Sequence, residues 1–133
     1  MIHGVGIDIV EIERIRKAVD RWGEKFLRRI FTDREIAYCY ERKNPFPSLA
    51  VRFAAKEAFI KASGSETVLP LTDIEVFNSV NGRPSIRARG RLEGFLTEHS
   101  LREVHVSLSH EREYGIAFVL LEKRDKLSTD EGP

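Results

Sequence analysis

One helix of this sequence is apolar on nearly every side. Residues 49–62 have helical character, Ser48 can cap the segment, and Gly64 can end it, since glycine tolerates the left-handed conformation that closes helices. A surface helix has one apolar stripe and one polar face, so a helix that is apolar all round must be buried. Its apolar residues are Leu49, Val51, Phe53, Ala54, Ala55, Ala58, Phe59, Ile60 and Ala62.

The few charged residues of this helix are Arg52, Lys56, Glu57 and Lys61. At about 100° per residue, Glu57 and Lys61 share a sector roughly 60° wide with two alanines, which leave room for a ligand. A simpler interpretation is an ion pair between Glu57 and Lys61, four residues apart on a solvated stripe. The pattern alone leaves both interpretations open.

Asp8 interrupts the first apolar run of the chain. Residues 2–10 are rich in β-branched side chains, which predicts a strand buried on both faces. A carboxylate is rarely buried unless it is paired or binds a metal. Asp8 and Glu57 together would offer the hard oxygen ligands that usually hold Mg²⁺, and the basic residues Lys61 and Arg52 could meet phosphates. The alternative is that Asp8 ends the strand or caps the helix that follows it.

The remaining periodicity predicts an α+β fold. We expect helices over 12–22, 26–30, 32–42 and 92–96, the third opened by a capping box of Thr32 and Glu35. We expect strands over 69–80, 84–89, 104–108 and 115–121, with a two-residue hairpin turn at Asn81-Gly82. The last strand is apolar on both faces, which suits a central position. This order is typical of several helices packed on an antiparallel or mixed sheet. We place this single domain at 1–122 and expect 123–133 to be a charged, frayed tail.

Composition limits the partners and the location of the protein. The chain has 133 residues, of which 22 are Lys or Arg and 21 are Asp or Glu, so its formal charge is +1. Without a global basic field, we expect neither nucleic acid nor a membrane surface as a partner. A single cysteine, Cys39, and the lack of about 18 consecutive apolar residues indicate a cytoplasmic protein without an internal disulfide or a membrane span.

The helix expected over 12–22 carries a basic stripe. Arg14, Lys17 and Arg21 are three and four residues apart, so they share one face. Such a stripe is usually a solvated face, and the functional alternative is a docking surface for an acidic protein. The opposite side is an apolar seam of Ile12, Ile15, Val19 and Trp22.

Two other patterns fail as functional motifs. The glycines at positions 4 and 6 lack the third glycine of a dinucleotide-binding turn, because Ile9 stands in its place. The histidine and serines at 105–109 point in parallel from one strand face, and the chain has no nucleophile elbow, so a serine hydrolase is not expected.

Five segments resemble, in order, those of the bacterial holo-acyl-carrier-protein synthases of the 4'-phosphopantetheinyl transferase superfamily. They are GVGIDIVEIERI, RIFTDREIAYC, RFAAKEAFIKASG, NGRPSI and HVSLSHEREY, and they cover nearly the whole chain before the tail. The resemblance implies a homotrimer with active sites between neighbouring subunits. It also implies Mg²⁺-dependent transfer of 4'-phosphopantetheine from coenzyme A to a serine of apo-acyl carrier protein, which releases adenosine 3',5'-bisphosphate and supports fatty acid biosynthesis.

The same resemblance implies roles for particular residues. Asp8 and Glu57 would bind Mg²⁺, and Lys61 would contact the diphosphate. Arg14 and Arg21 would meet the acidic carrier protein. The coenzyme pocket would be lined by Arg52, Gly64, Arg83, Pro84 and His105, with contacts across a subunit boundary. The loop Ser63-Gly64-Ser65-Glu66-Thr67 departs from the family pattern.

The chemistry suits these residues and leaves three alternatives. Phosphoryl transfer needs positioning and charge neutralisation rather than a nucleophile on this chain, and Glu57 would help to deprotonate the attacking serine. The alternatives are a longer-type transferase with a broader carrier range, a module that binds coenzyme or carrier without transfer, and an α+β domain whose buried charges are structural.

Overall fold

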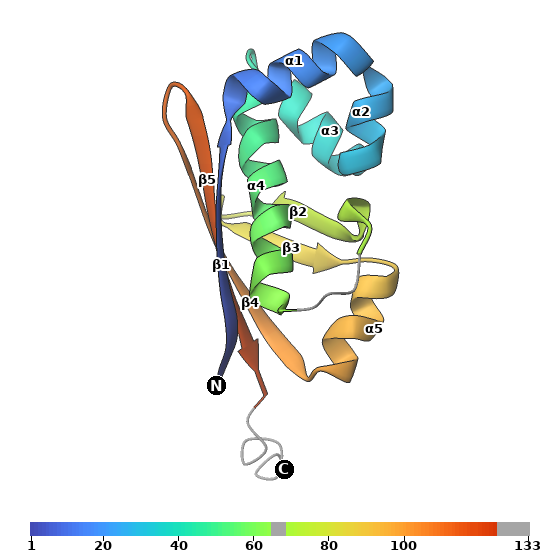
Figure 1. The fold of residues 1–133 in the computed structure, drawn as a ribbon, viewed down its shortest axis with the longest axis vertical. Coiled ribbons are helices and arrows are strands. Elements are labelled where there is room, and N and C mark those ends of the chain that lie inside the picture. Colours follow the sequence, from blue (N-terminus) through green and yellow to red (C-terminus); the bar gives the residue numbers. More distant parts are fainter. Residues whose placement is uncertain (65–68, 125–133) are drawn as a thin grey trace.

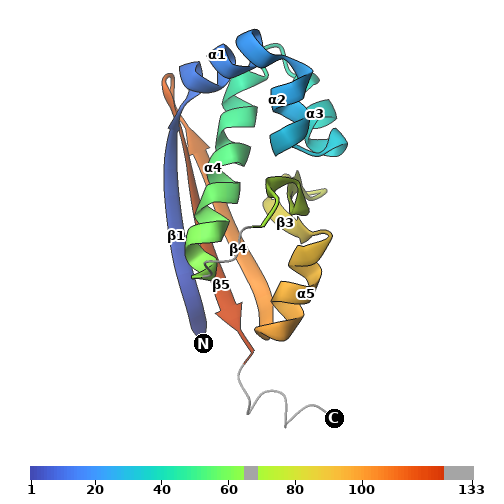
Figure 2. The same cartoon turned by 45° about the vertical axis from the view of Figure 1, so that its right-hand side comes forward.

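Helix α4 (Phe46–Ser63) is the centre of the fold in a computed structural model that describes residues 1–64 and 69–124. Around it lie β1 (Ile2–Glu11), α1 (Ile12–Trp22), α2 (Glu24–Ile30), α3 (Asp33–Tyr40), the 3₁₀ helix η1 (Leu71–Asp73), β2 (Ile74–Asn78), β3 (Pro84–Ala88), α5 (Arg91–Glu98), β4 (Leu101–His110) and β5 (Tyr114–Lys123). Helices α1, α2 and α3 gather at one end of the molecule (Figure 1). One face of α4 packs on a three-stranded antiparallel sheet ordered β1-β5-β4, and the β2-β3 hairpin and α5 lie on its other side (Figure 2). The α+β fold is thus confirmed, with both sheets antiparallel.

The long helix is buried as predicted. Leu49, Ala54 and Phe59 have no exposed surface, although at about 100° per residue they point in three different directions from the helix axis. Gly64 follows the last turn in the left-handed conformation, with φ at 67°, so the predicted end of the helix is also confirmed.

The start of α4 differs from the prediction. The helix begins at Phe46 and carries Pro47 in its first turn, where backbone amides need no partner within the helix. Ser48 therefore lies inside the helix and does not cap it. Its hydroxyl and its carbonyl oxygen instead accept hydrogen bonds from Arg52.

The three helices at the end of the molecule follow the expected pattern, with one exception. The backbone amide of Glu35 donates to Thr32 Oγ1 at 3.3 Å, and the backbone amide of Thr32 donates to Glu35 Oε1 at 2.9 Å, which is the predicted capping box. Ile12 and Ile15 are buried, as the apolar seam of α1 requires. Trp22 does not complete this seam, because the helix ends beyond the core and leaves the side chain 56% exposed.

The three-stranded sheet is covered on one face only within this chain. β5 occupies the centre, as predicted, and the face toward α4 is buried. The other face exposes large apolar side chains, including Ile7 and Ile9 at 58%. The expectation that β1 is buried on both faces is therefore wrong for the single chain, and the central strand β5 also exposes one apolar face, because an apolar pattern does not say which chain covers the second face. The exposed residues of this outer apolar face are Val5, Ile7, Ile9, Ile116 and Phe118.

The β2-β3 connection is longer than the predicted two-residue turn. Asn78 pairs with Pro84, so five residues, 79–83, form the loop. The amide of Gly82 donates to the carbonyl of Ser79 at 2.8 Å, and Gly82 has a positive φ of 85°. The glycine is thus used as the sequence suggested, but inside a wider loop whose ends are joined by the amide of Ser79 and the carbonyl of Arg83.

Two further expectations concern the end of the chain and membranes. β5 continues through Lys123, and 125–133 of the predicted tail lies outside the described residues. Among the described residues, no helix combines the length and the apolar character needed to cross a bilayer.

Candidate active site

Strand β1 passes unusually close to helix α4. A Cβ atom added at Gly6 would lie 1.9 Å from the carbonyl oxygen of Ala58, and one added at Gly4 would lie 1.9 Å from that of Ala62. Only glycine fits at either position, because the opposing atoms belong to the backbone and cannot rotate away. The glycine pair that fails as a nucleotide-binding motif therefore brings the strand and the helix into direct contact.

This contact brings the three predicted catalytic residues together. Lys61 Nζ lies 3.1 Å from Asp8 Oδ1 and donates to the carbonyl of Ile7 at 3.0 Å. The Asp8 side chain is only 18% exposed. Burial, and next the negative charge of Asp8, raise the pKa of Glu57, while Lys61 acts in the opposite direction. The two carboxylates and the ammonium group thus form one charged cluster, here called the carboxylate site.

The geometry excludes the structural alternatives for Asp8 and Glu57. Asp8 pairs with Ala117 in the middle of β1, whereas Glu11 is the residue that precedes α1, so Asp8 neither ends the strand nor caps the helix. Among the ion pairs of the described residues, Lys61 is joined to Asp8 and not to Glu57. A solvated pair along one helix stripe is therefore not what these residues form.

The carboxylate site has the chemistry of a divalent metal site. Two partly buried carboxylates lie near enough for the charge of Asp8 to act on Glu57, and one ammonium group lies beside Asp8, so their negative charges are only partly compensated. Carboxylate oxygens are the ligands that Mg²⁺ prefers, and one or two of them usually suffice when phosphates supply the rest. Asp8 and Glu57 could hold such an ion.

Arg52 lies two turns before Lys61 in α4 and is 2% exposed. Its guanidinium donates to Ser48 and to Asn78 Oδ1 and lies over the ring of Tyr38, 4.3 Å from the ring centre. Its Nε atom is buried without a hydrogen-bond partner, and no carboxylate pairs with it among the described residues. Such a buried, uncompensated cation is suited to an anion that arrives from outside the chain.

Arg83, Pro84 and His105 come together in a cavity of about 440 Å³ between the hairpin and β4. This cavity and the carboxylate site lie at opposite edges of the sheet, on β4 and β1, and His105 points away from the face that bears Asp8. Asp8 lies in register with the buried Ala117, whereas His105 lies in register with Leu120 and belongs to the outer face. Each chain thus presents two separate groups of predicted site residues. Gly64 belongs with the first group, since it follows Lys61 by three residues at the end of α4.

The basic stripe continues onto a feature that sequence reasoning missed. Arg14 and Arg21 are both exposed on α1, and the guanidinium of Arg21 lies 4.9 Å from the centre of the Trp22 ring. Beyond them, Trp22, Lys25, Phe26 and Arg29 line a hollow of about 260 Å³. An apolar hollow with basic residues around it suits an amphipathic, acidic partner. The sequence did contain a signal for this hollow, a tryptophan in the last turn of the helix. Periodicity alone assigned that tryptophan to the core.

Comparisons with known proteins agree with these observations. Residues 4–119 match the 4'-phosphopantetheinyl transferase superfamily. A holo-[acyl-carrier-protein] synthase of Halothermothrix orenii is 44% identical over 124 residues, which are 92% of this chain and 99% of that protein. One of Thermodesulfovibrio yellowstonii is 46% identical over 91% of this chain and 99% of that protein. The crystal structure of the Neisseria meningitidis synthase is similar with a TM-score of 0.86 and 35% identity, over 92% of this chain and 100% of that one. The Helicobacter pylori synthase, solved in complex with coenzyme A, has a TM-score of 0.79 and 32% identity over 89% and 99% of the two chains.

Proposed function

The chain belongs to the 4'-phosphopantetheinyl transferase superfamily as one of its holo-[acyl-carrier-protein] synthases, and we propose that it transfers 4'-phosphopantetheine from coenzyme A to a serine hydroxyl of apo-acyl carrier protein. The other product is adenosine 3',5'-bisphosphate. The modified carrier protein would serve fatty acid biosynthesis in the cytoplasm. The observation that carries the proposal is the convergence of Asp8, Glu57 and Lys61, from a strand and a helix far apart in sequence, on one carboxylate site.

Magnesium fits the carboxylate site. Asp8 and Glu57 would hold the ion, since burial and then the like charge of Asp8 raise the pKa of Glu57 and only one ammonium group compensates the two carboxylates. When bound, Mg²⁺ supplies positive charge to the diphosphate oxygens of the coenzyme.

The side chains of the chain supply charge neutralisation and a base. The serine oxygen of the carrier protein attacks the phosphorus next to the pantetheine, and the bond from that phosphorus to the adenosine bisphosphate breaks. Lys61 would neutralise charge on the diphosphate as it shifts toward the leaving group. Glu57 is the best candidate to take the serine proton, because it is a half-buried carboxylate whose pKa is raised by burial and then by the charge of Asp8.

The two separate groups of site residues support a homotrimer with shared active sites. One subunit would offer the carboxylate site, and its neighbour would offer Arg83, Pro84 and His105 to the same coenzyme molecule, with Arg52 on the phosphates. The outer apolar face supports the same arrangement, because a continuous row of exposed apolar side chains on a small domain usually marks a contact between proteins.

The carrier protein would dock on α1 and α2. Arg14 and Arg21 provide positive charge on one face, and the adjoining hollow at Trp22 accepts apolar side chains. Complementary charge mainly raises the association rate and sets the orientation of the partners. A carrier that docks there would present its serine near the strand that bears Asp8.

Mass spectrometry of an apo-acyl carrier protein tests the function directly. After incubation with the protein, coenzyme A and Mg²⁺, we expect the carrier to gain the mass of 4'-phosphopantetheine, and a chelator should prevent the gain. Asp8→Ala and Glu57→Ala should each abolish transfer in a folded protein, because each removes one of two hard ligands. Coenzyme binding without any mass gain would identify a binding module instead, and near wild-type turnover of either variant would contradict the metal site.

Sedimentation equilibrium and mixed trimers test the shared site. We expect a trimer at micromolar concentration. Co-expressed Asp8→Ala and Arg83→Ala chains should recover part of the activity that each variant lacks alone, since a junction between two different chains can contain one intact site. A fully active monomer, or mixed trimers without any recovery, would contradict this arrangement.

A further inference from the structure

A buried charged network lies on the side of α4 that faces away from the carboxylate site. Lys56 is 0% exposed and uses all three of its N–H groups: it donates to Glu35 Oε1 at 2.8 Å, to the carbonyl of Leu71 at 2.9 Å and to the carbonyl of Ile74. Burial lowers the pKa of Lys56, and the neighbouring charge of Glu35 opposes this effect. The residue next to the metal ligand Glu57 thus ties α4 to α3, η1 and β2.

Two buried glutamates extend this network into the hairpin. Glu35 Oε2 accepts the backbone amide of Val76 at 2.8 Å. Glu75 accepts the hydroxyl of Thr32 and pairs with Arg87 at 2.9 Å and Arg89 at 3.3 Å. Burial acts to raise the pKa of Glu75, but the Thr32 hydroxyl and the two arginines outweigh it and lower that pKa. The network therefore joins one helix at the end of the molecule, the central helix and both hairpin strands.

A second clamp lies one turn earlier on the same side of α4. Arg52 donates to the side chain of Asn78, the last residue of β2, while Lys56 donates to the carbonyl of Ile74, the first residue of β2. Both ends of the strand are thus held on the helix that carries Glu57. Beyond Asn78 the chain turns directly into the segment that bears Arg83.

We propose that Lys56, neutralised by Glu35, is a positioning residue for coenzyme binding. It fixes the β2-β3 hairpin against α4 and so sets where Arg83 and Pro84 meet the coenzyme. The inference rests on the proposed function. The reason is geometric. Buried hydrogen bonds and ion pairs form only when their partners are correctly placed, so this network favours one position of the hairpin on α4, whereas apolar contacts alone would allow several.

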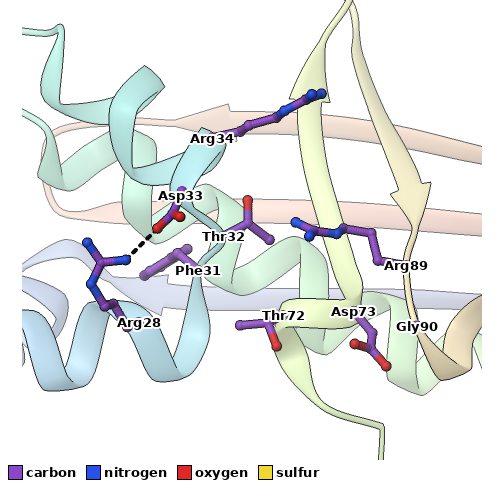
Figure 3. A pocket seen from close by; sticks show the side chains of 9 residues that line it. All are labelled: Arg28, Phe31, Thr32, Asp33, Arg34, Thr72, Asp73, Arg89 and Gly90. Atoms are coloured by element: carbon purple, nitrogen blue, oxygen red, sulfur yellow. Dashed lines mark hydrogen bonds and ion pairs between the residues drawn. The ribbon is translucent and has the colours of Figure 1, made fainter.

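The outer edge of the network offers a matched control. Thr32 and Arg89 line a pocket of about 570 Å³ between α2, α3 and the start of the hairpin (Figure 3). Arg28 lines the same pocket, but its ion pairs are with Glu24 and Asp33, as Figure 3 shows for Asp33. An arginine on the same cavity thus lies outside the network.

The test removes the buried charges together, so that neither is left unpaired. In Lys56→Met with Glu35→Gln we expect a folded trimer with a coenzyme A dissociation constant raised about tenfold or more by calorimetric titration, as for a site displaced by a fraction of an ångström. Mn²⁺ binding at the carboxylate site should stay at the wild-type value, because the partners of Lys56 lie on α3, η1 and β2, whereas the carboxylate site is built against β1. Arg28→Met should bind coenzyme A as the wild type does.

Each other outcome overturns the inference. A folded double variant with wild-type coenzyme affinity would show that the network does not position the hairpin. A double variant that cannot fold, or that loses Mn²⁺ and coenzyme binding equally, would show that the network serves only the fold. The titration does not depend on transfer, so the two proposals can fail separately. If the wild type binds coenzyme A but does not modify the carrier, only the proposed function is contradicted. If the wild type does not bind coenzyme A, both proposals are contradicted.

Discussion

Replacing Gly6 by alanine should separate β1 from α4 and disable the carboxylate site. The new Cβ would lie 1.9 Å from the carbonyl oxygen of Ala58, about 1.5 Å short of ordinary van der Waals contact. Since that oxygen belongs to the helix backbone, the whole strand or helix must move. Overpacking of this kind costs about 1–3 kcal/mol of folding free energy. A displacement of about 1 Å in a catalytic site costs roughly a hundredfold in rate, so we expect turnover to fall by about that factor.

Three measurements on Gly6→Ala test this reasoning. Circular dichroism and urea titration give the folded fraction and the free energy of unfolding, and turnover is then expressed per folded protein. The Mn²⁺ dissociation constant shows whether Asp8 and Glu57 keep the spacing that a shared ion needs. Gly94→Ala is the matched control. Gly94 lies within α5 with no atom within 4 Å of its added Cβ, so alanine there should stabilise the helix by about 0.5–1 kcal/mol and leave turnover unchanged.

The reasoning fails if Gly6→Ala folds and keeps wild-type turnover and Mn²⁺ affinity. The close approach of strand and helix would then not be what sets the spacing of Asp8 and Glu57. Equal effects of Gly6→Ala and Gly94→Ala would contradict it as well, because only the first position meets backbone.

Three further predictions concern charge. Lys61→Ala should lower turnover more than Arg52→Ala does, because only Lys61 would contact charge that changes during transfer. Arg52→Ala should chiefly raise the KM for coenzyme A. If steady-state kinetics show the reverse order, the two roles are exchanged. Arg14→Glu with Arg21→Glu should raise the KM for carrier protein about tenfold or more and weaken its salt dependence, and an unchanged KM at low ionic strength would leave the stripe a solvated face. Because the pKa of Glu75 is lowered in the folded chain, the unfolded chain binds its proton first as pH falls, so folding stability should drop as the pH falls below the ordinary glutamate value of 4.5. Urea titrations on both sides of this pH should show a smaller drop for Glu75→Gln, and equal drops would contradict the assignment.

Local patterns in the sequence predicted the elements whose structure depends on nearby residues. The apolar helix, its end at Gly64 and the Thr32/Glu35 capping box are each decided within a few residues, and all three are present. The sequence also singled out Asp8 and Glu57 as charges in apolar segments, but it left open whether they meet, which the close contact of β1 and α4 decides.

The remaining features depend on contacts that a local pattern does not contain. The role of Gly6 is decided by the backbone of Ala58, which is distant in sequence. Trp22 lies at helical spacing from the buried residues of α1, but α1 extends past the hydrophobic core, so the side chain is exposed. The network of Lys56 joins segments whose pairing only the folded chain defines, so the sequence placed this lysine in a buried helix without indicating its burial or its partners.

The pairing of β1 with β5 sets the order in which the molecule can be completed during synthesis. Gly4 pairs with Leu121 and Glu11 with Tyr114, and β5 is the only strand beside β1 in the described sheet. The first strand to leave the ribosome therefore cannot pair until the last strand of the described chain has been synthesised. Contacts so distant in sequence form slowly, and transiently exposed apolar surface favours aggregation. Until β5 emerges, β1 and β4 have no strand between them, so the sheet that covers α4 is incomplete and part of the most apolar helix stays exposed to chaperones.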